Sequence, residues 1–190
     1  MKTNRSKKGF TLMELIIVLA ILGILLSIMV PTWGYFIRKS RERNANSKAK
    51  IVFNAAQTEI TRIAGKERPL AASGRYVGNG TFYFYSLNGH GVKCDSDGNA
   101  VTGGNANETN ELAINNGNLS RAINRIAGNE GSYKIFVENY NVVSVVYSNF
   151  ENGQYKGTYP KTTDQLDDTQ LERVRDNSVQ EALMSDMKLD

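Results

Sequence analysis

The sequence predicts an α+β protein in which one long N-terminal helix packs on a small antiparallel sheet. Two observations carry this prediction. Apolar residues at helical spacing continue far beyond the length of an ordinary helix, and short β-prone runs between turn residues follow from about residue 74. The chain has 190 residues, which suffices for one domain and an appendage. Its single cysteine excludes an intramolecular disulfide.

The first half of the predicted helix is apolar on every side. The uncharged run from Leu15 to Ile37 is long enough to cross the hydrocarbon core of a bilayer, which is about 30 Å thick. It exceeds the apolar core of a secretory signal, which is roughly 7–15 residues, and no small-residue cleavage site follows it. We therefore expect a retained membrane helix, with Trp33 and Tyr35 at interfacial depth.

The positive charge of the chain is concentrated in its leader, residues 1–9. This segment has four basic side chains and no acid, whereas the formal charge of the whole chain is +4. Without the leader the chain is close to neutral, so its basic pI does not indicate a nucleic-acid partner. Basic residues flank both ends of the apolar run, so the charge rule does not decide topology, and the short leader favours a cytoplasmic N-terminus.

The second half of the helix is predicted to be amphipathic. Apolar residues from Ala45 to Ala64 recur at spacings of three and four with polar residues between them, which places the helix at about residues 11–64. Gly65 and Pro69 are expected to end it. Within the apolar half, Gly23 and Pro31 are expected to be points where the helix bends.

The remainder of the chain has a mixed pattern. Strands are predicted at 81–85, 133–137 and 142–147, the last two as an antiparallel hairpin, and a short helix over 118–127 with Gly128 as its stop. In the aromatic run 81–85 we expect one buried and one partly exposed face. Residues 95–107 read as a loop, and 163–187 have a sparse helical pattern that fits either a surface helix or partial disorder.

One acid stands out at the start of the apolar run. The motif Gly9-Phe10-Thr11-Leu12-Met13-Glu14 begins at the last residue of the basic leader, and the predicted apolar helix continues from it. This arrangement resembles the signal of type IV pilin precursors and of the related pseudopilins of type II secretion. The resemblance is specific over about the first 35 residues, and Pro31 also falls where many members have a proline.

The resemblance implies processing and assembly. A prepilin peptidase would cut between Gly9 and Phe10, and the new Phe10 amine would be N-methylated. Glu14 would pair with the amine of a neighbouring pilin subunit and set the register of the filament. An assembly machine would draw the protein from the membrane lipid into a surface or periplasm-spanning filament. Residues 1–9 are then a leader, 10–37 a membrane and filament-core helix, and 38–190 an extracytoplasmic pilin domain.

Other readings remain open at this level. The chain could serve as a pseudopilin or minor pilin of a secretion or DNA-uptake system, or as a membrane-tethered binding domain that never polymerises. Asp95, Asp97 and Asn99 have the oxygen-ligand spacing of the first half of a calcium loop, but the pattern fails afterwards, and a polar turn is the alternative. The lone His90 and Cys94 give no catalytic pattern, so we expect no enzyme and no other cofactor.

Overall fold

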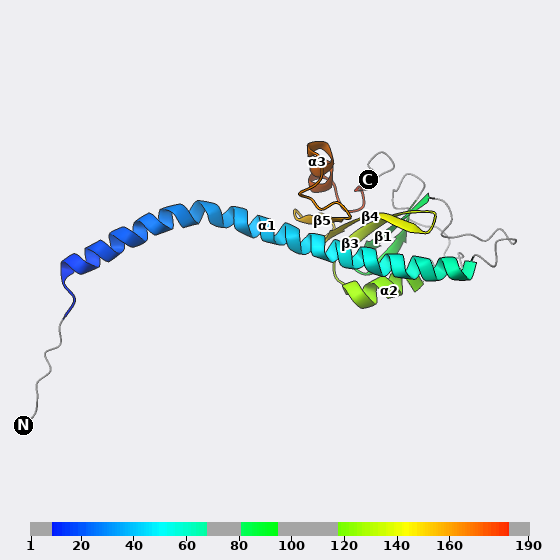
Figure 1. Ribbon diagram of the computed structural model, residues 1–190, viewed down its shortest axis with the longest axis horizontal. Helices are drawn as coiled ribbons and strands as arrows, with labels where there is room; N and C mark the ends of the chain where they lie inside the picture. Colours follow the sequence, from blue (N-terminus) through cyan, green and yellow to red (C-terminus); the bar gives the residue numbers. More distant parts are fainter. Residues whose placement is uncertain (1–8, 68–80, 95–117, 183–190) are drawn as a thin grey trace, which may run out of the picture. The chain divides into compact units, whose positions relative to one another are not determined.

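The computed structural model describes residues 9–67, 81–94 and 118–182 (Figure 1). Three helices and five strands lie in these ranges, in the order α1, β1, β2, α2, β3, β4, β5, α3. The chain divides into two compact units, residues 1–40 and residues 41–190. Helix α1, Leu12–Glu67, contributes to both of them. Pro69 and the predicted calcium loop at 95–107 lie outside the described residues.

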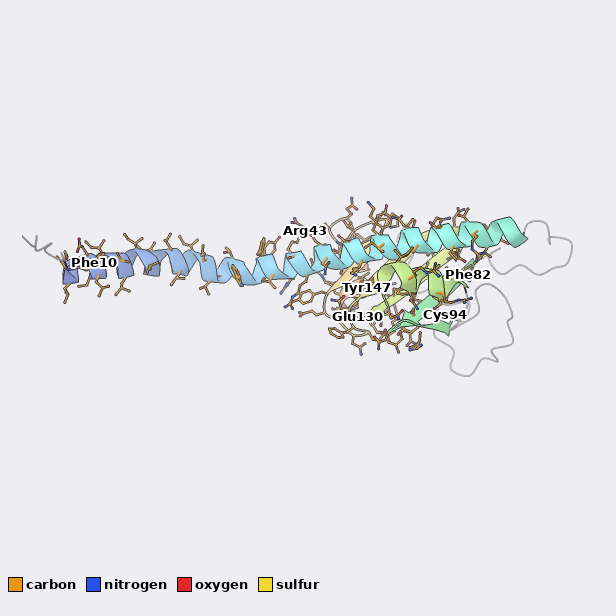
Figure 2. The ribbon with its side chains drawn as sticks, turned by 90° about the horizontal axis from the view of Figure 1, so that it is seen from below. Phe10, Arg43, Phe82, Cys94, Glu130 and Tyr147 are labelled. Carbon is orange, nitrogen blue, oxygen red and sulfur yellow. The ribbon has the colours of Figure 1, made fainter. Side chains whose placement is uncertain are left out.

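The part of α1 in the first unit exposes almost all of its side chains (Figure 2). Large apolar residues from Leu12 to Phe36 are about half to three-quarters exposed. Among the described residues, α1 is the one helix long and apolar enough to cross a membrane. The helix continues through Gly23 and Pro31, and the bends expected at these two residues stay predictions.

The part of α1 in the second unit buries one face. Its buried apolar side chains have the predicted spacing, and the helix ends at Glu67, so the prediction that Gly65 ends it was wrong by two residues. Alanines dominate this face because the helix backbone lies very close to the sheet. The buried apolar residues of this part of α1 are Ala45, Ala49, Val52, Ala55, Ala56, Ile60, Ile63 and Ala64.

The five strands form one antiparallel sheet in the order β2-β1-β3-β4-β5. The predicted strands are β1 (Thr81–Leu87), β3 (Ser132–Glu138) and β4 (Asn141–Ser148). The predicted β3–β4 hairpin is confirmed, with a bulge between Phe136 and Val137. Its turn residues Asn139 and Tyr140 both have positive φ, as the twist of a two-residue hairpin turn requires.

Two short edge strands were not predicted. Strand β2 (His90–Lys93) pairs with β1 through a turn at Asn88-Gly89, where both residues have positive φ. An Asn-Gly pair between β-prone residues is the strongest local signal for such a hairpin, so this strand could have been found. Strand β5 (Lys156–Tyr159) is four residues long and contains a glycine, so its sequence has no strand signal of its own.

Each face of the sheet has its own core. On one face, α1 and α2 (Asn118–Ala127) pack over alternate residues of β1, β3 and β4 (Figure 1). The predicted end of α2 at Gly128 is confirmed by that residue's positive φ. Leu119 and Ile123 of α2 are fully buried, but Ile126, predicted on the same face, is exposed, because the buried stripe follows a four-residue spacing through Ala127.

The opposite face is covered by the C-terminal part of the chain. Leu166, Val174 and Ala182 pack there on Tyr83, Phe136 and Val146 of the sheet. The expectation of one partly exposed aromatic face in 81–85 was wrong for Tyr83, Phe84 and Tyr85, which are all buried, whereas Phe82 is half-buried. Of the two readings of 163–187, the helical one is correct for α3, Asp168–Asp176, which packs against the domain through Val174. Residues 183–187 lie outside the described residues.

Buried polar groups hold this C-terminal cover in place. Arg175 pairs with Glu42 of α1 at 2.9 Å, and the Arg175 carbonyl accepts a hydrogen bond from Lys156 Nζ, also at 2.9 Å. Lys134, fully buried on β3, donates to the Gln180 carbonyl at 2.5 Å. Burial lowers the pKa of Lys156, because a charged amine is disfavoured away from water. These contacts join the C-terminal cover to both the sheet and α1.

Helix α1 lies very close to the sheet at β5. A Cβ on Gly157 would overlap the α1 backbone at Ala45 and Asn46, so only glycine fits there. Beside it, the Asn46 side chain accepts a hydrogen bond from the Thr158 N–H at 2.9 Å and donates to Thr163 Oγ1 at 3.1 Å. Asn46, a polar residue on the buried face of α1, thus provides a hydrogen-bond acceptor for a backbone N–H of the edge strand β5.

Candidate functional site

The predicted processing and register residues surround the first turn of α1. Gly9 and Phe10 immediately precede the helix, and both are exposed, Phe10 by 90%. A Cβ added to Gly9 would meet no heavy atom within 4 Å. Both residues are therefore accessible in this unit.

Thr11 and Glu14 form a capping box at the start of α1. The Thr11 N–H donates to Glu14 Oε2 at 2.8 Å, and the Thr11 hydroxyl donates to the same oxygen at 3.0 Å. In return, the Glu14 N–H donates to Thr11 Oγ1 at 3.3 Å. These bonds satisfy two backbone donors that the first turn of a helix otherwise leaves free.

The capping box gives Glu14 a local role that the sequence analysis missed. The signal was present, because Thr-x-x-Glu before an apolar run is the pattern of a capped helix N-terminus. Glu14 Oε2 receives both hydrogen bonds, and Oε1 has no hydrogen-bond partner among the residues that the structure describes. The carboxylate is thus fixed in direction and keeps one oxygen available for a cation.

Helix α1 presents two further predicted residues farther along. Gly23 has no atom near the position of a Cβ, so no close packing within the chain requires glycine there. Pro31 lies inside the helix, and the next residue, Thr32, donates its hydroxyl to the Met29 carbonyl at 3.0 Å. Proline removes the backbone donor to the Ser27 carbonyl four residues earlier, and the Thr32 bond goes to a different carbonyl.

The predicted metal site and the lone titratable residues add no chemistry here. Asp95, Asp97 and Asn99 lie outside the described residues, so calcium binding stays a prediction. Among the described residues, no group of three or more His, Cys, Asp or Glu side chains could hold a metal ion. His90 is exposed at the start of β2, and the thiol of Cys94 is half-buried.

Comparison with known proteins identifies the class to which this N-terminal arrangement corresponds. Residues 4–30 match the family described as the prokaryotic N-terminal methylation motif. Two fimbrial proteins of Pseudomonas aeruginosa are each 38% identical over 63 residues, which are 33% of this chain and 40% of theirs. The type IV major pilin protein PilA of Myxococcus xanthus (strain DK1622) is 38% identical over 55 residues, 29% of this chain and 25% of that protein.

These matches confirm the resemblance to type IV pilins. The chain is type IV pilin-like: it has the methylation motif, the long apolar N-terminal helix and a helix-on-sheet arrangement of the pilin kind. The match spans about two fifths of the length of the Pseudomonas relatives. No solved structure matches the chain. The comparisons do not distinguish a pilin from a pseudopilin.

Proposed function

We propose that this protein is a structural subunit of a type IV pilus-like filament and is made as a precursor. A prepilin peptidase cuts between Gly9 and Phe10, and the Phe10 amine is then N-methylated. The subunit is stored in the membrane with α1 as its anchor. An assembly machine then extracts it and adds it to the filament. It catalyses no reaction, as expected of the structural class of the relatives it resembles.

The observation that supports this proposal best is the start of α1. An accessible Gly9-Phe10 pair, a capped first turn with one acid, and an uncharged surface to Ile37 occur in immediate succession. A soluble protein would gain nothing from so much exposed apolar surface, which marks a membrane or protein interface. A simple anchor would not need the acid, because a charge inside a membrane costs free energy.

In the filament, Glu14 would receive the Phe10 amine of a neighbouring subunit. Thr11 already supplies two donors to Oε2, which leaves Oε1 for this amine. Pairing offsets the cost of placing each charge among apolar helices, and removing one partner of a buried pair costs about 3–5 kcal/mol. A neighbour displaced along the helix would leave both charges unpaired, so the pair selects one register. Gly23 and Pro31 would let the helix bend during assembly.

The test is to determine the mature N-terminus by mass spectrometry and to count fibres sheared from cells. We expect an N-terminal methylated Phe10, and we expect Glu14→Ala to be processed normally but to give no fibres. The matched control is Glu59→Ala, since Glu59 is an acid on the same helix that pairs with Arg62 inside the domain. An intact leader, a cut elsewhere, or normal fibres from Glu14→Ala would contradict the proposal.

The abundance of the subunit in these fibres separates the remaining readings. A major pilin would form most of the fibre mass, whereas a minor pilin or a pseudopilin of a secretion or DNA-uptake system would be scarce in it. A tethered domain that never polymerises would be absent from sheared fibres although the chain remains in the membrane.

A further inference from the structure

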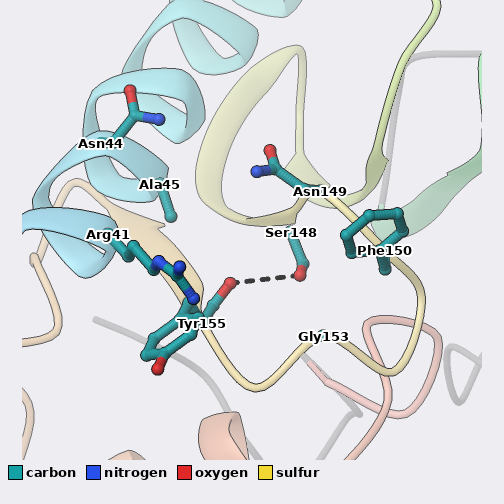
Figure 3. Close-up of a pocket in the computed structure, with 8 residues that line it drawn as sticks. All are labelled: Arg41, Asn44, Ala45, Ser148, Asn149, Phe150, Gly153 and Tyr155. Carbon is teal, nitrogen blue, oxygen red and sulfur yellow. Dashed lines mark hydrogen bonds between the residues drawn. The ribbon is translucent and has the colours of Figure 1, made fainter. Parts of the chain in front are cut away.

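A cavity of about 310 Å³ opens between α1 and the connection from β4 to β5 (Figure 3). It lies entirely within the second unit of the chain. Side chains of Arg41 and Asn44 contribute from α1, and Ser148, Asn149, Phe150 and Tyr155 from the other wall. None of the predicted pilin residues belongs to it, so the filament proposal does not account for it.

The chemistry of the cavity is that of an anion site with one apolar edge. The Arg41 guanidinium lies over the Tyr155 ring, 5.1 Å from its centre. The Asn149 amide oxygen accepts from the Tyr147 hydroxyl at 3.2 Å, which leaves its NH₂ group as a donor. No carboxylate lines the cavity, and Phe150 is 75% exposed beside it. An arginine fork with amide donors matches a phosphate group.

The surroundings of Arg41 on α1 are cationic. Arg38, Lys39 and Arg43 lie within three residues of it, and the one acid in that stretch is Glu42. The Glu42 carboxylate is buried and paired with Arg175, so it does not neutralise the exposed cations. A basic stretch next to a membrane helix attracts anionic lipids.

The position of the cavity along α1 selects the source of the phosphate. Arg41 follows Ile37, the last residue of the uncharged run, by four residues of the same helix, or about 6 Å. The polar headgroup layer extends roughly 5–8 Å beyond the hydrocarbon core on each side. When α1 spans the bilayer, Arg41 therefore lies at headgroup depth along the helix.

We propose that this cavity binds the headgroup phosphate of an anionic phospholipid while the subunit is stored in the membrane. Arg41 holds the phosphate, and Asn149 lines the same cavity with its amide donor. The inference rests on the proposed membrane stage and does not depend on polymerisation. The contact would be broken when the subunit leaves the bilayer for a filament.

The experiment uses the full chain in phosphatidylcholine vesicles that contain brominated lipid. Trp33 is the sole tryptophan, so Trp33→Phe with Phe150→Trp places one fluorescent reporter at the cavity. We expect brominated phosphatidylglycerol to quench this reporter more strongly than brominated phosphatidylcholine. Arg41→Gln should reduce that preference by more than the roughly fivefold that one basic residue near an anionic surface contributes by itself. Asn149→Asp, which keeps Arg41 but adds a negative charge to the cavity, should reduce it as well.

The matched control is Arg43→Gln, which removes the same charge from the same helix but from a residue outside the cavity. It should reduce the preference for phosphatidylglycerol only by the roughly fivefold effect of one surface charge, which is less than the loss in Arg41→Gln. Equal losses in Arg41→Gln and Arg43→Gln would overturn the proposal in favour of a diffuse basic surface. Equal quenching by the two brominated lipids would overturn it too. So would a reporter that neither lipid quenches, if residue 150 of one copy can be cross-linked to residue 150 of another. A chain that does not enter vesicles contradicts the membrane stage itself, whereas a chain that enters without lipid preference contradicts only this site.

Discussion

The two parts of α1 differ in what surrounds them although they share one continuous helix. Up to Phe36 the large apolar side chains are exposed on every side, whereas from Ala45 onward small apolar residues are buried on one face only. The large apolar side chains of the first part are not buried against any part of the chain that the structure describes. Their surface is suited to lipid or other helices. The second part is a component of the domain. One continuous helix can therefore have one part suited to lipid or other helices and another part suited to the domain core. The side chains of each part determine which surroundings it fits.

The largest expected effect contrasts two glycines of the two units. Gly157→Ala places a Cβ against the backbone of α1, which cannot move away without separating from β5. We expect a loss in the free energy of unfolding of more than about 4 kcal/mol, a value that single substitutions seldom reach. Gly23→Ala meets open space and should leave the domain unchanged. Urea unfolding of the full chain in detergent, followed by tyrosine fluorescence, measures both; similar results for the two variants would refute the contrast.

A smaller effect contrasts two isoleucines of α1. Ile60 is 1% exposed and lies in the core over the sheet, so Ile60→Ala should destabilise the domain by about 2–5 kcal/mol through lost burial and a cavity. Ile21 is 53% exposed, and Ile21→Ala should not change domain unfolding. The same unfolding measurement checks the pair. If Ile21→Ala also lowered domain stability, the apolar part of α1 would be contributing to the domain core.

The smallest effect is a pH dependence of the domain. Burial raises the pKa of Tyr133 to about 12, and its hydroxyl donates to Asn124 Oδ1 at 3.2 Å, a bond that also favours the protonated form. Between pH 10 and 12 the unfolded chain loses this proton and the folded chain keeps it. The free energy of unfolding should therefore fall with rising pH, by about 1.4 kcal/mol per pH unit for this tyrosine.

Unfolding of the parent and of Tyr133→Phe, measured at several alkaline pH values, tests this dependence. The variant loses one hydrogen bond at neutral pH but should show a shallower decline above pH 10. Burial also raises the pKa of Tyr85 and Tyr147, so some decline remains in the variant. An equal slope in both proteins would exclude Tyr133 as a source.

Local patterns in the sequence predicted a large part of the fold. The spacing of apolar residues located α1, α2 and three strands, because each pattern follows from the geometry of a single element. The Gly9-Phe10 to Glu14 signal and the uncharged run after it also needed no tertiary information. The capping box and the Asn88-Gly89 turn had local signals too, and these could have been found.

Other features depend on what packs against a residue and were decided only by the tertiary structure. No local pattern singles out Gly157 or Asn46. In the structure, Gly157 leaves room for the α1 backbone, and the Asn46 side chain accepts a hydrogen bond from the Thr158 N–H in the edge strand β5. The burial of Tyr83 on the second face of β1 depends on a C-terminal segment about a hundred residues away. Arg41 reads as one of several basic residues until the cavity distinguishes it from Arg43. The sequence by itself determined the periodic elements and the N-terminal signal, because both depend only on residues that are close together in the chain. The core, the buried polar contacts and the cavity arise from distant residues brought together, which no local pattern specifies.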